Sequence, residues 1–247
     1  MTDRLRPLPL YAEIGRTYLR WAPSLLLLAV IVFIPVGLVH TIAIHPDINA
    51  LDLDGALQIL GVLLAVMALA ITGLLGEVFY TGSVAILLTH PHDDRPPSLG
   101  EIARMVKYRR LIAIDLLYGV VVAVGLVLLV APGAAAFVWF ALAAPVVEIE
   151  GRGVRAAFAR SVQLIRGRFW AVFAVLVPIE LVGDAIATLA AGIAHDLLGE
   201  TFLSEWLADV LANLAFTPFY AVAAVLITVW LIGEKDGVAT ELHSEPR

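Results

Sequence analysis

Four acidic residues lie inside or at the edge of long apolar stretches: Glu77, Asp115, Glu180 and Asp184. An ionised carboxylate at the centre of a bilayer costs about 2.5–3.5 kcal/mol, so these side chains should face the protein interior, a wet cavity or a partner. Glu180 and Asp184 are four residues apart and share one face of a helix. Two such carboxylates repel each other unless one is protonated or both hold a cation. Together with Glu77 they form a candidate proton or cation site. The alternative is a neutral acid that hydrogen-bonds a neighbouring helix.

Asp115 and Glu77 lie closer to the ends of their apolar stretches. A carboxylate at that depth can reach water along its own side chain or pair with a cation near the membrane surface. Lys107, Arg109 and Arg110 lie nearby in the sequence. We therefore expect these two acids to snorkel or to form ion pairs.

A second pair of acids, Glu148 and Glu150, precedes a glycine-rich turn. We expect them to pair with Arg152 or Arg155, or to complement the amino end of the next helix. The histidines and acids of the remaining segments match no metal-binding spacing and predict a solvated acidic surface. They are His40, His45, Asp47, Asp52, Asp54, His195 and Asp196, with a similar group at residues 90–94.

Known catalytic motifs are missing from the sequence. It contains no cysteine, no phosphate-binding loop, no dinucleotide fingerprint and no recognisable Ser/His/Asp set. We therefore predict a protein that is not an enzyme, with no catalytic residues, no metal site and no cofactor.

The elements that must position the four acids are membrane helices. Of the 247 residues, 61% are hydrophobic and only 15% are charged, and the mean hydropathy is +0.93. A soluble domain is about half apolar and about a quarter charged, so part of this surface must face lipid. A helix needs about 20 apolar residues to cross a bilayer. Six stretches approach that length: residues 22–39, 57–88, 111–130, 134–147, 169–194 and 207–232. Ala131-Pro132-Gly133 predicts a tight turn between the third and the fourth.

The basic residues are sorted by position. All 16 Lys and Arg residues fall in segments 1–21, 89–110, 148–168 and 233–247, and the loops between the other ends of the six stretches contain none. Cytoplasmic loops carry the excess of Lys and Arg in membrane proteins. The pattern therefore predicts a multi-pass protein of the cell membrane with both termini in the cytoplasm. The net charge of −6 argues against a nucleic-acid partner.

Three of the basic segments also have the pattern of amphipathic helices. They lie around residues 10–21, at residues 98–106, where Ser98 and Glu101 have capping-box spacing, and at residues 154–165, where Val154, Phe158, Ser161 or Val162, and Ile165 form one stripe. We expect each to lie on the inner membrane surface. Five residues are candidate ligands for anionic lipid headgroups or a partner protein: Arg104, Lys107, Arg155, Arg160 and Arg166.

The predicted fold class is therefore all-α. It is a polytopic membrane protein with six transmembrane helices and three interfacial helices on the cytoplasmic face. Residues 1–247 form a single integral membrane domain with units at about 8–90, 97–148 and 152–233, each an interfacial helix followed by two membrane helices. We expect residues 234–247 to be a short disordered tail.

Two stretches resemble a known family. They are Leu5-Arg-Pro-Leu-Pro-Leu-Tyr-Ala-Glu-Ile-Gly-Arg-Thr-Tyr-Leu-Arg20, and the region from Ala144-Pro-Val-Val-Glu-Ile-Glu-Gly151 through Ala156-Ala-Phe-Ala-Arg-Ser161 to Leu164-Ile-Arg-Gly167. Together they resemble the bacterial family of YciC-like proteins, which includes the membrane domain fused to some glycerophosphodiester phosphodiesterases. The resemblance implies an all-helical membrane domain. The phosphodiesterase barrel would be a separate domain, so its activity is not implied.

Two functions remain open from the sequence. The first is a non-enzymatic membrane module that binds anionic inner-leaflet lipid, a partner protein or a second copy of itself through its Arg-rich face. The alternative is a small transporter or channel component that uses the buried carboxylates for proton or cation coupling.

Overall fold

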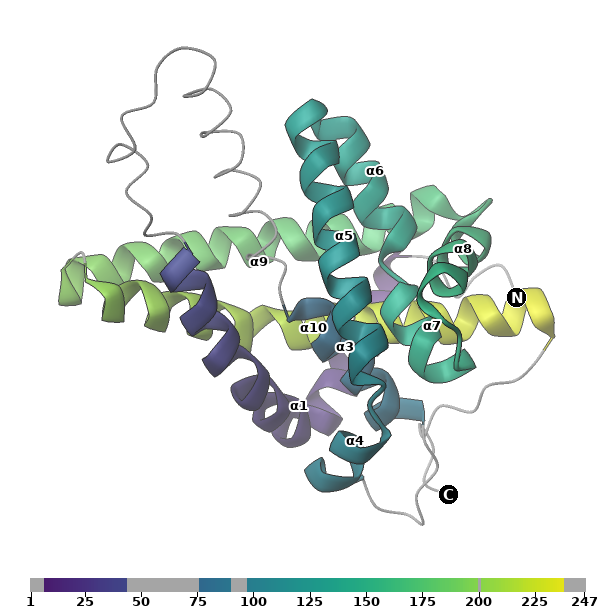
Figure 1. Cartoon of the computed structure of the whole chain (residues 1–247), viewed down its shortest axis with the longest axis horizontal. Coiled ribbons are helices and arrows are strands. Elements are labelled where there is room, and N and C mark those ends of the chain that lie inside the picture. Colours follow the sequence, from purple (N-terminus) through teal and green to yellow (C-terminus); the bar gives the residue numbers. More distant parts are fainter. Residues whose placement is uncertain (1–6, 44–75, 90–96, 200, 238–247) are drawn as a thin grey trace.

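The computed structural model describes residues 7–43, 76–89, 97–199 and 201–237 (Figure 1). Helices account for 91% of the structure, and the described residues contain no strand. The predicted all-α class is confirmed at this level. The helices are α1 (Pro7–Ala43), α3 (Glu77–Thr89), α4 (Leu99–Met105), α5 (Tyr108–Leu128), α6 (Val130–Phe140), α7 (Ala143–Glu150), α8 (Val154–Ile165), α9 (Phe169–Leu198) and α10 (Phe202–Asp236).

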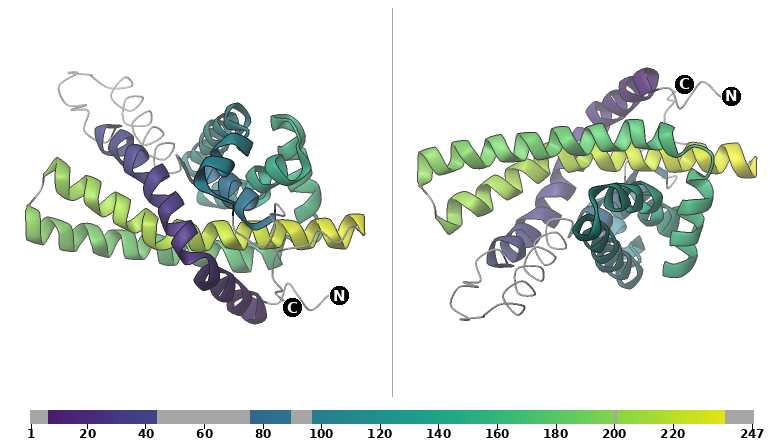
Figure 2. Two further views of the ribbon diagram at one scale, coloured as in Figure 1. Left: turned by 90° about the horizontal axis from the view of Figure 1, so that it is seen from below. Right: turned by 90° about the horizontal axis from the view of Figure 1, so that it is seen from above.

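The long helices α9 and α10 form an antiparallel pair, and α1 crosses it diagonally (Figure 2). Helices α5 and α6 form a second antiparallel hairpin that projects away from this pair (Figure 1). Short helices α3 and α7 lie between the hairpin and α10, where they contact each other and α10. Every residue of α10 from position 220 to 229 is buried, which makes this half of α10 the central element of the core.

Five segments of the described chain are long and apolar enough to cross a membrane. They are Leu8–Thr41, Tyr108–Leu128, Val130–Glu150, Phe169–Leu198 and Phe202–Asp236. The chain is therefore a helical protein of membrane type. The second predicted stretch, residues 57–88, lies mostly outside the described residues. Its described part contains α3, which begins directly after Gly76. Gly76 has φ +93°, which lies outside the α-helical region, so α3 covers only the end of the predicted stretch.

The amphipathic segment near the amino end is not a separate helix. It is the first part of the continuous helix α1, in which Leu10 and Ile14 are completely buried. The predicted capping box is confirmed: Ser98 accepts the N–H of Glu101, and the Glu101 carboxylate accepts the N–H of Ser98 at 2.7 Å. Ile102 on the apolar face of α4 is buried.

The buried face of α8 overlaps the predicted stripe at Ser161 and Ile165 and extends to residues outside it. Its buried residues are Ala157, Arg160, Ser161, Leu164 and Ile165. Val154 and Phe158 pack only at the edge of the core. Ser161 lies on the buried face because it hydrogen-bonds α6 and the residue before α7. Its hydroxyl donates to Trp139 O at 2.7 Å and accepts the N–H of Leu142 at 3.3 Å.

The hairpin of α5 and α6 turns at Leu129, two residues before the predicted turn. Leu129 alone separates the two helices, in an extended conformation with φ −167° and ψ 144°, and Ala131-Pro132-Gly133 forms the first turn of α6. Proline is tolerated there because the first N–H groups of a helix have no helical acceptor. The hairpin is tight: a Cβ added at Gly125 would lie 2.8 Å from Gly133 Cα.

The last turn of α10 corrects the prediction of a disordered tail from residue 234. Glu234, Lys235 and Asp236 are helical, and each contacts another part of the protein. Residues 238–247 lie outside the described residues.

Candidate functional site

A cavity of about 850 Å³ lies between α1, the start of α3, the α5–α6 hairpin, α9 and the first half of α10. Its lining combines apolar side chains with five acids: Glu77, Glu180, Asp184, Glu205 and Asp209. Among the described residues that line it there is no Lys or Arg. A cavity of this composition attracts cations and repels anions.

Glu180 and Asp184 face this cavity from consecutive turns of α9. Glu180 is partly buried, whereas Asp184 is exposed in the described structure. Glu77 enters from α3 and interacts electrostatically with both of them. The structure therefore brings together the three carboxylates that the sequence nominates.

Helix α9 contains a proline, Pro178, two residues before Glu180. Pro178 has no N–H, so the carbonyl of Ala174, four residues earlier, lacks its helical donor. The Tyr11 hydroxyl of α1 supplies the missing bond, donating to Ala174 O at 3.0 Å and to Val175 O at 3.1 Å. This contact ties α1 to α9 between one and two helical turns before Glu180.

Two tyrosines stand next to the carboxylates. Tyr118 of α5 and Tyr220 of α10 share a side-chain hydrogen bond, and both interact electrostatically with Glu77 and Glu180. Tyr118 Oη also lies 3.4 Å from Phe137 O, to which it donates. Tyrosine hydroxyls both donate and accept, so this pair can solvate a carboxylate, a proton or a cation.

Asp115 has a structural role that the sequence did not predict. It is 5% exposed, and its carboxylate accepts the N–H of Gly76 at 2.9 Å. It thereby caps the amino end of α3 from the neighbouring helix α5. The expected ion pairs are absent among the described contacts: Lys107 pairs with Glu148, and Arg110 donates to the carbonyls of Gly151 and Arg152.

The opposite end of the cavity is also polar. His40 of α1 interacts electrostatically with Asp209 of α10, and Trp206 Nε1 donates to Ile34 O at 3.2 Å. His195 and Glu205 line the same region. His45, Asp47, Asp52, Asp54 and residues 90–94 lie outside the described residues. No group of three or more His, Asp or Glu able to hold a metal ion occurs in the part of the chain that was described.

The basic segments meet near the carboxyl end of α10, away from this polar region. Lys107 Nζ lies 2.9 Å from Glu148 Oε2, and the Glu148 carboxylate also accepts the N–H of Lys107 at 3.0 Å. The Glu148 side chain is only 1% exposed. Lys235 donates to Gln163 O and, at 3.0 Å, to Arg166 O, and Arg168 pairs with Glu234.

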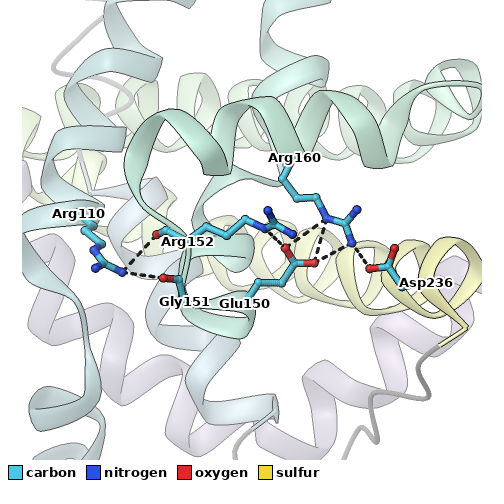
Figure 3. A network of polar contacts seen from close by, with 6 residues as sticks. All are labelled: Arg110, Glu150, Gly151, Arg152, Arg160 and Asp236. Atoms are coloured by element: carbon cyan, nitrogen blue, oxygen red, sulfur yellow. Dashed lines mark hydrogen bonds and ion pairs between the residues drawn. The ribbon is translucent and has the colours of Figure 1, made fainter.

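Arg160 is the centre of a charged network (Figure 3). Its Nε donates to Glu150 at 3.0 Å, its Nη2 lies 2.9 Å from the same carboxylate, and it also pairs with Asp236. Glu150 in turn pairs with Arg152, as predicted. Burial alone would lower the pKa of Arg160, but the bonds to the two carboxylates outweigh it and raise the pKa above its ordinary value. The residue therefore remains a cation inside the protein.

The sequence-predicted basic candidates thus divide into two groups. Lys107 and Arg160 are engaged inside the protein, whereas Arg104, Arg155 and Arg166 have exposed positions. The correction for Arg160 has a simple reason: its partners are 10 and 76 residues away in the sequence, beyond what helical spacing reveals.

The sequence reasoning missed the polar residues that α10 contributes to the cavity. Asp209, Asn213, Thr217 and Tyr220 recur at intervals of four, four and three residues on α10, and all four line the cavity. Thr217 Oγ1 donates to Asn213 Oδ1 at 3.1 Å along this stripe. A polar stripe in an otherwise apolar helix was the available signal.

Comparisons with known proteins give no relatives: no protein-family model, no curated protein and no solved structure matches the chain. The resemblance to YciC-like proteins therefore stays a prediction.

Proposed function

We propose that this chain is a small membrane transporter or channel component that binds protons or small cations in its polar cavity, with Glu77 and Glu180 as the binding carboxylates. One observation carries the proposal. The cavity of about 850 Å³ is lined by five acids and, among the described residues, by no Lys or Arg. The proposed role is not enzymatic.

The chemistry follows from the mutual repulsion of the carboxylates. Glu77 interacts unfavourably with both Glu180 and Asp184 when all three are charged. A proton or a cation that enters the cavity relieves this repulsion, so the site favours cationic occupants. The Tyr118 and Tyr220 hydroxyls supply neutral ligands beside the charges.

We further propose the six membrane spans that the sequence predicts, with α3 at the end of the second, and both termini in the cytoplasm of a cell membrane. The ion pairs support this sidedness. They join the segments around Lys107, Glu148, Arg160 and Asp236 to one another, and these are the segments that the charge distribution assigns to one side. His40, near the carboxyl end of α1, and Asp209, near the amino end of α10, interact with each other on the side assigned to the outside.

Flux through the reconstituted protein tests the proposal. The purified protein is reconstituted into liposomes that contain a pH-sensitive dye. A proton gradient or a Na⁺ gradient is then applied across the liposome membrane, and the dye reports the movement of protons. We expect Glu180→Gln to abolish the flux that the parent shows, because the amide keeps the size of the side chain and removes its charge. The matched control is Asp196→Asn, an exposed acid on the same helix outside the cavity lining. A parent without flux, or an unchanged Glu180→Gln variant, would refute the proposal.

Arg104, Arg155 and Arg166 favour a second candidate function, the binding of anionic lipid or a partner protein. Arg104 lies on α4, Arg155 lies on α8 and Arg166 directly follows α8, and the sequence assigns both helices to the inner surface. Native mass spectrometry of the gently purified protein tests it. Loss of bound anionic lipid in the Arg155→Ala/Arg166→Ala variant is the expected result, and full retention would contradict this function.

A further inference from the structure

A second, much smaller void adjoins the cavity, since Glu77 and Tyr220 line both. Its volume of about 10 Å³ is room for a single particle of the size of a water molecule. The polar residues that line it are Glu77, Thr81, Tyr118 and Tyr220, and all of them offer oxygen atoms. None of the described lining residues is Lys, Arg or His.

Thr81 is the unusual member of this group. It is 2% exposed, and its hydroxyl has no hydrogen-bond partner among the described residues. Several other helical threonines donate to the carbonyl four residues earlier, as Thr89 does to Ala85 O at 2.6 Å and Thr228 to Ala224 O at 2.7 Å. Buried hydroxyls are almost always bonded, because the loss of hydration is otherwise uncompensated. An occupant of the void would give this oxygen its partner.

The charges around the void decide what kind of occupant fits. Glu77 lies one helical turn before Thr81 on the same face of α3. It also experiences the charges of Glu180 and Asp115, so an anion is excluded by repulsion. The single proton of the Tyr118 hydroxyl is directed at Phe137 O and Tyr220, so its oxygen lone pairs stay available to coordinate another group.

The volume of the void further restricts which cation can occupy it. Mg²⁺ keeps several of its waters in proteins, and Ca²⁺ takes six to eight oxygens. A void for one particle, with one nearby carboxylate and three hydroxyls, suits neither of these ions. A small monovalent cation that has lost its water shell matches both the charge and the volume.

We propose that this void binds one dehydrated monovalent cation of the size of Na⁺. Glu77 supplies the charge, and Thr81, Tyr118 and Tyr220 supply neutral oxygens. This inference rests on the proposed function, because it names the ion that the same cavity handles. Binding of the ion neutralises Glu77 and removes its repulsion of Glu180, so it couples the void to the larger cavity.

Thermal unfolding of the full chain in detergent micelles tests the site without any transport. The unfolding midpoint is measured in NaCl, KCl and choline chloride at one ionic strength. A ligand that binds only the folded state raises the midpoint, by about 5–10 °C at 100 times its dissociation constant for a chain of this size. We expect this rise in NaCl, a smaller one in KCl and none in choline chloride.

Two variants and a control locate the effect. Thr81→Val should abolish the Na⁺-dependent rise, whereas Thr81→Ser, which keeps the hydroxyl, should retain it. Thr228→Val removes a hydroxyl that is equally buried but bonded within α10, and it should leave the rise unchanged. Equal midpoints of the parent in NaCl and choline chloride would overturn the proposal without any variant. A rise that survives in Thr81→Val would overturn it as well.

The outcomes separate this inference from the proposed function. Proton flux that depends on Glu180, without a Na⁺-dependent rise in the midpoint, leaves the cavity as a proton site and overturns the ion site. A Na⁺-dependent rise that is lost in Thr81→Val, in a protein without flux, supports the ion site and overturns transport.

Discussion

Replacement of Arg160 distinguishes an internal structural cation from a ligand for lipid. The guanidinium bonds two carboxylates, and the side chains of Arg160 and Glu150 are only 10% and 14% exposed. A hydrogen bond to a charged group contributes about 1.5–3 kcal/mol, and the loss of a buried ion-pair partner costs about 3–5 kcal/mol. Asp236 is 38% exposed and can return to water, and Glu150 keeps Arg152. We therefore expect Arg160→Met to lower the free energy of unfolding by about 2–3 kcal/mol.

Arg152→Met is the matched control. Arg152 shares the partner Glu150, but its side chain is 41% exposed. Exposed ion pairs contribute about 0–1 kcal/mol, so this variant should lose much less. The free energy of unfolding is measured by denaturant titration in micelles, and bound lipid is measured on the same samples by native mass spectrometry. Arg160→Met should retain its lipid. Equal losses of stability in the two variants, or release of lipid by Arg160→Met alone, would refute the reasoning.

Two further predictions concern the elements that shape the cavity. Asp115→Leu should lower the free energy of unfolding by about 1–3 kcal/mol, because the N–H of Gly76 loses its acceptor. Asp115→Asn keeps an acceptor oxygen and should lose less stability. Equal losses of the two variants in a denaturant titration would contradict the capping role. Gly133→Ala should cost about 1–3 kcal/mol, because its Cβ would lie 2.7 Å from the backbone nitrogen of Leu126. Gly192→Ala, which meets no atom within 4 Å, should show no such loss in the same titration, and a Gly133→Ala variant as stable as the parent would disprove the close hairpin contact.

The sequence predicted the elements that depend on local pattern. Five of the six apolar stretches correspond to segments long and apolar enough to cross a membrane, and the capping box at Ser98 formed as its spacing required. The start of α3 directly after Gly76 was not predictable, because glycine is common in membrane helices and the N–H of Gly76 is bonded by Asp115 of α5. Local sequence contains no information on that contact across 39 residues.

The candidate site, too, was predictable only where local spacing determines it. Spacing predicted that Glu180 and Asp184 share a face of α9, and the structure adds Glu77 from α3. Thr81, Tyr118 and Tyr220 were missed because a threonine or a tyrosine in a membrane helix is ordinary until its neighbours are known. Only the tertiary arrangement shows that the Thr81 hydroxyl, unlike that of Thr89, lacks the usual carbonyl partner.

Helix α10 has two halves with different tasks, and Pro218 lies between them. The stripe from Asp209 to Thr217 faces the cavity, while residues 220–229 are buried on all sides. The last turn is tied to α8 through Asp236 and Arg160. Proline removes one helical hydrogen bond, so α10 is weakened where the polar half meets the anchored half. Pro178 weakens α9 in the same way two residues before Glu180. The two helices that carry most of the acids of the cavity thus each contain a proline near their polar groups, a feature that the proposed binding of a cation would use if the helices adjust to it.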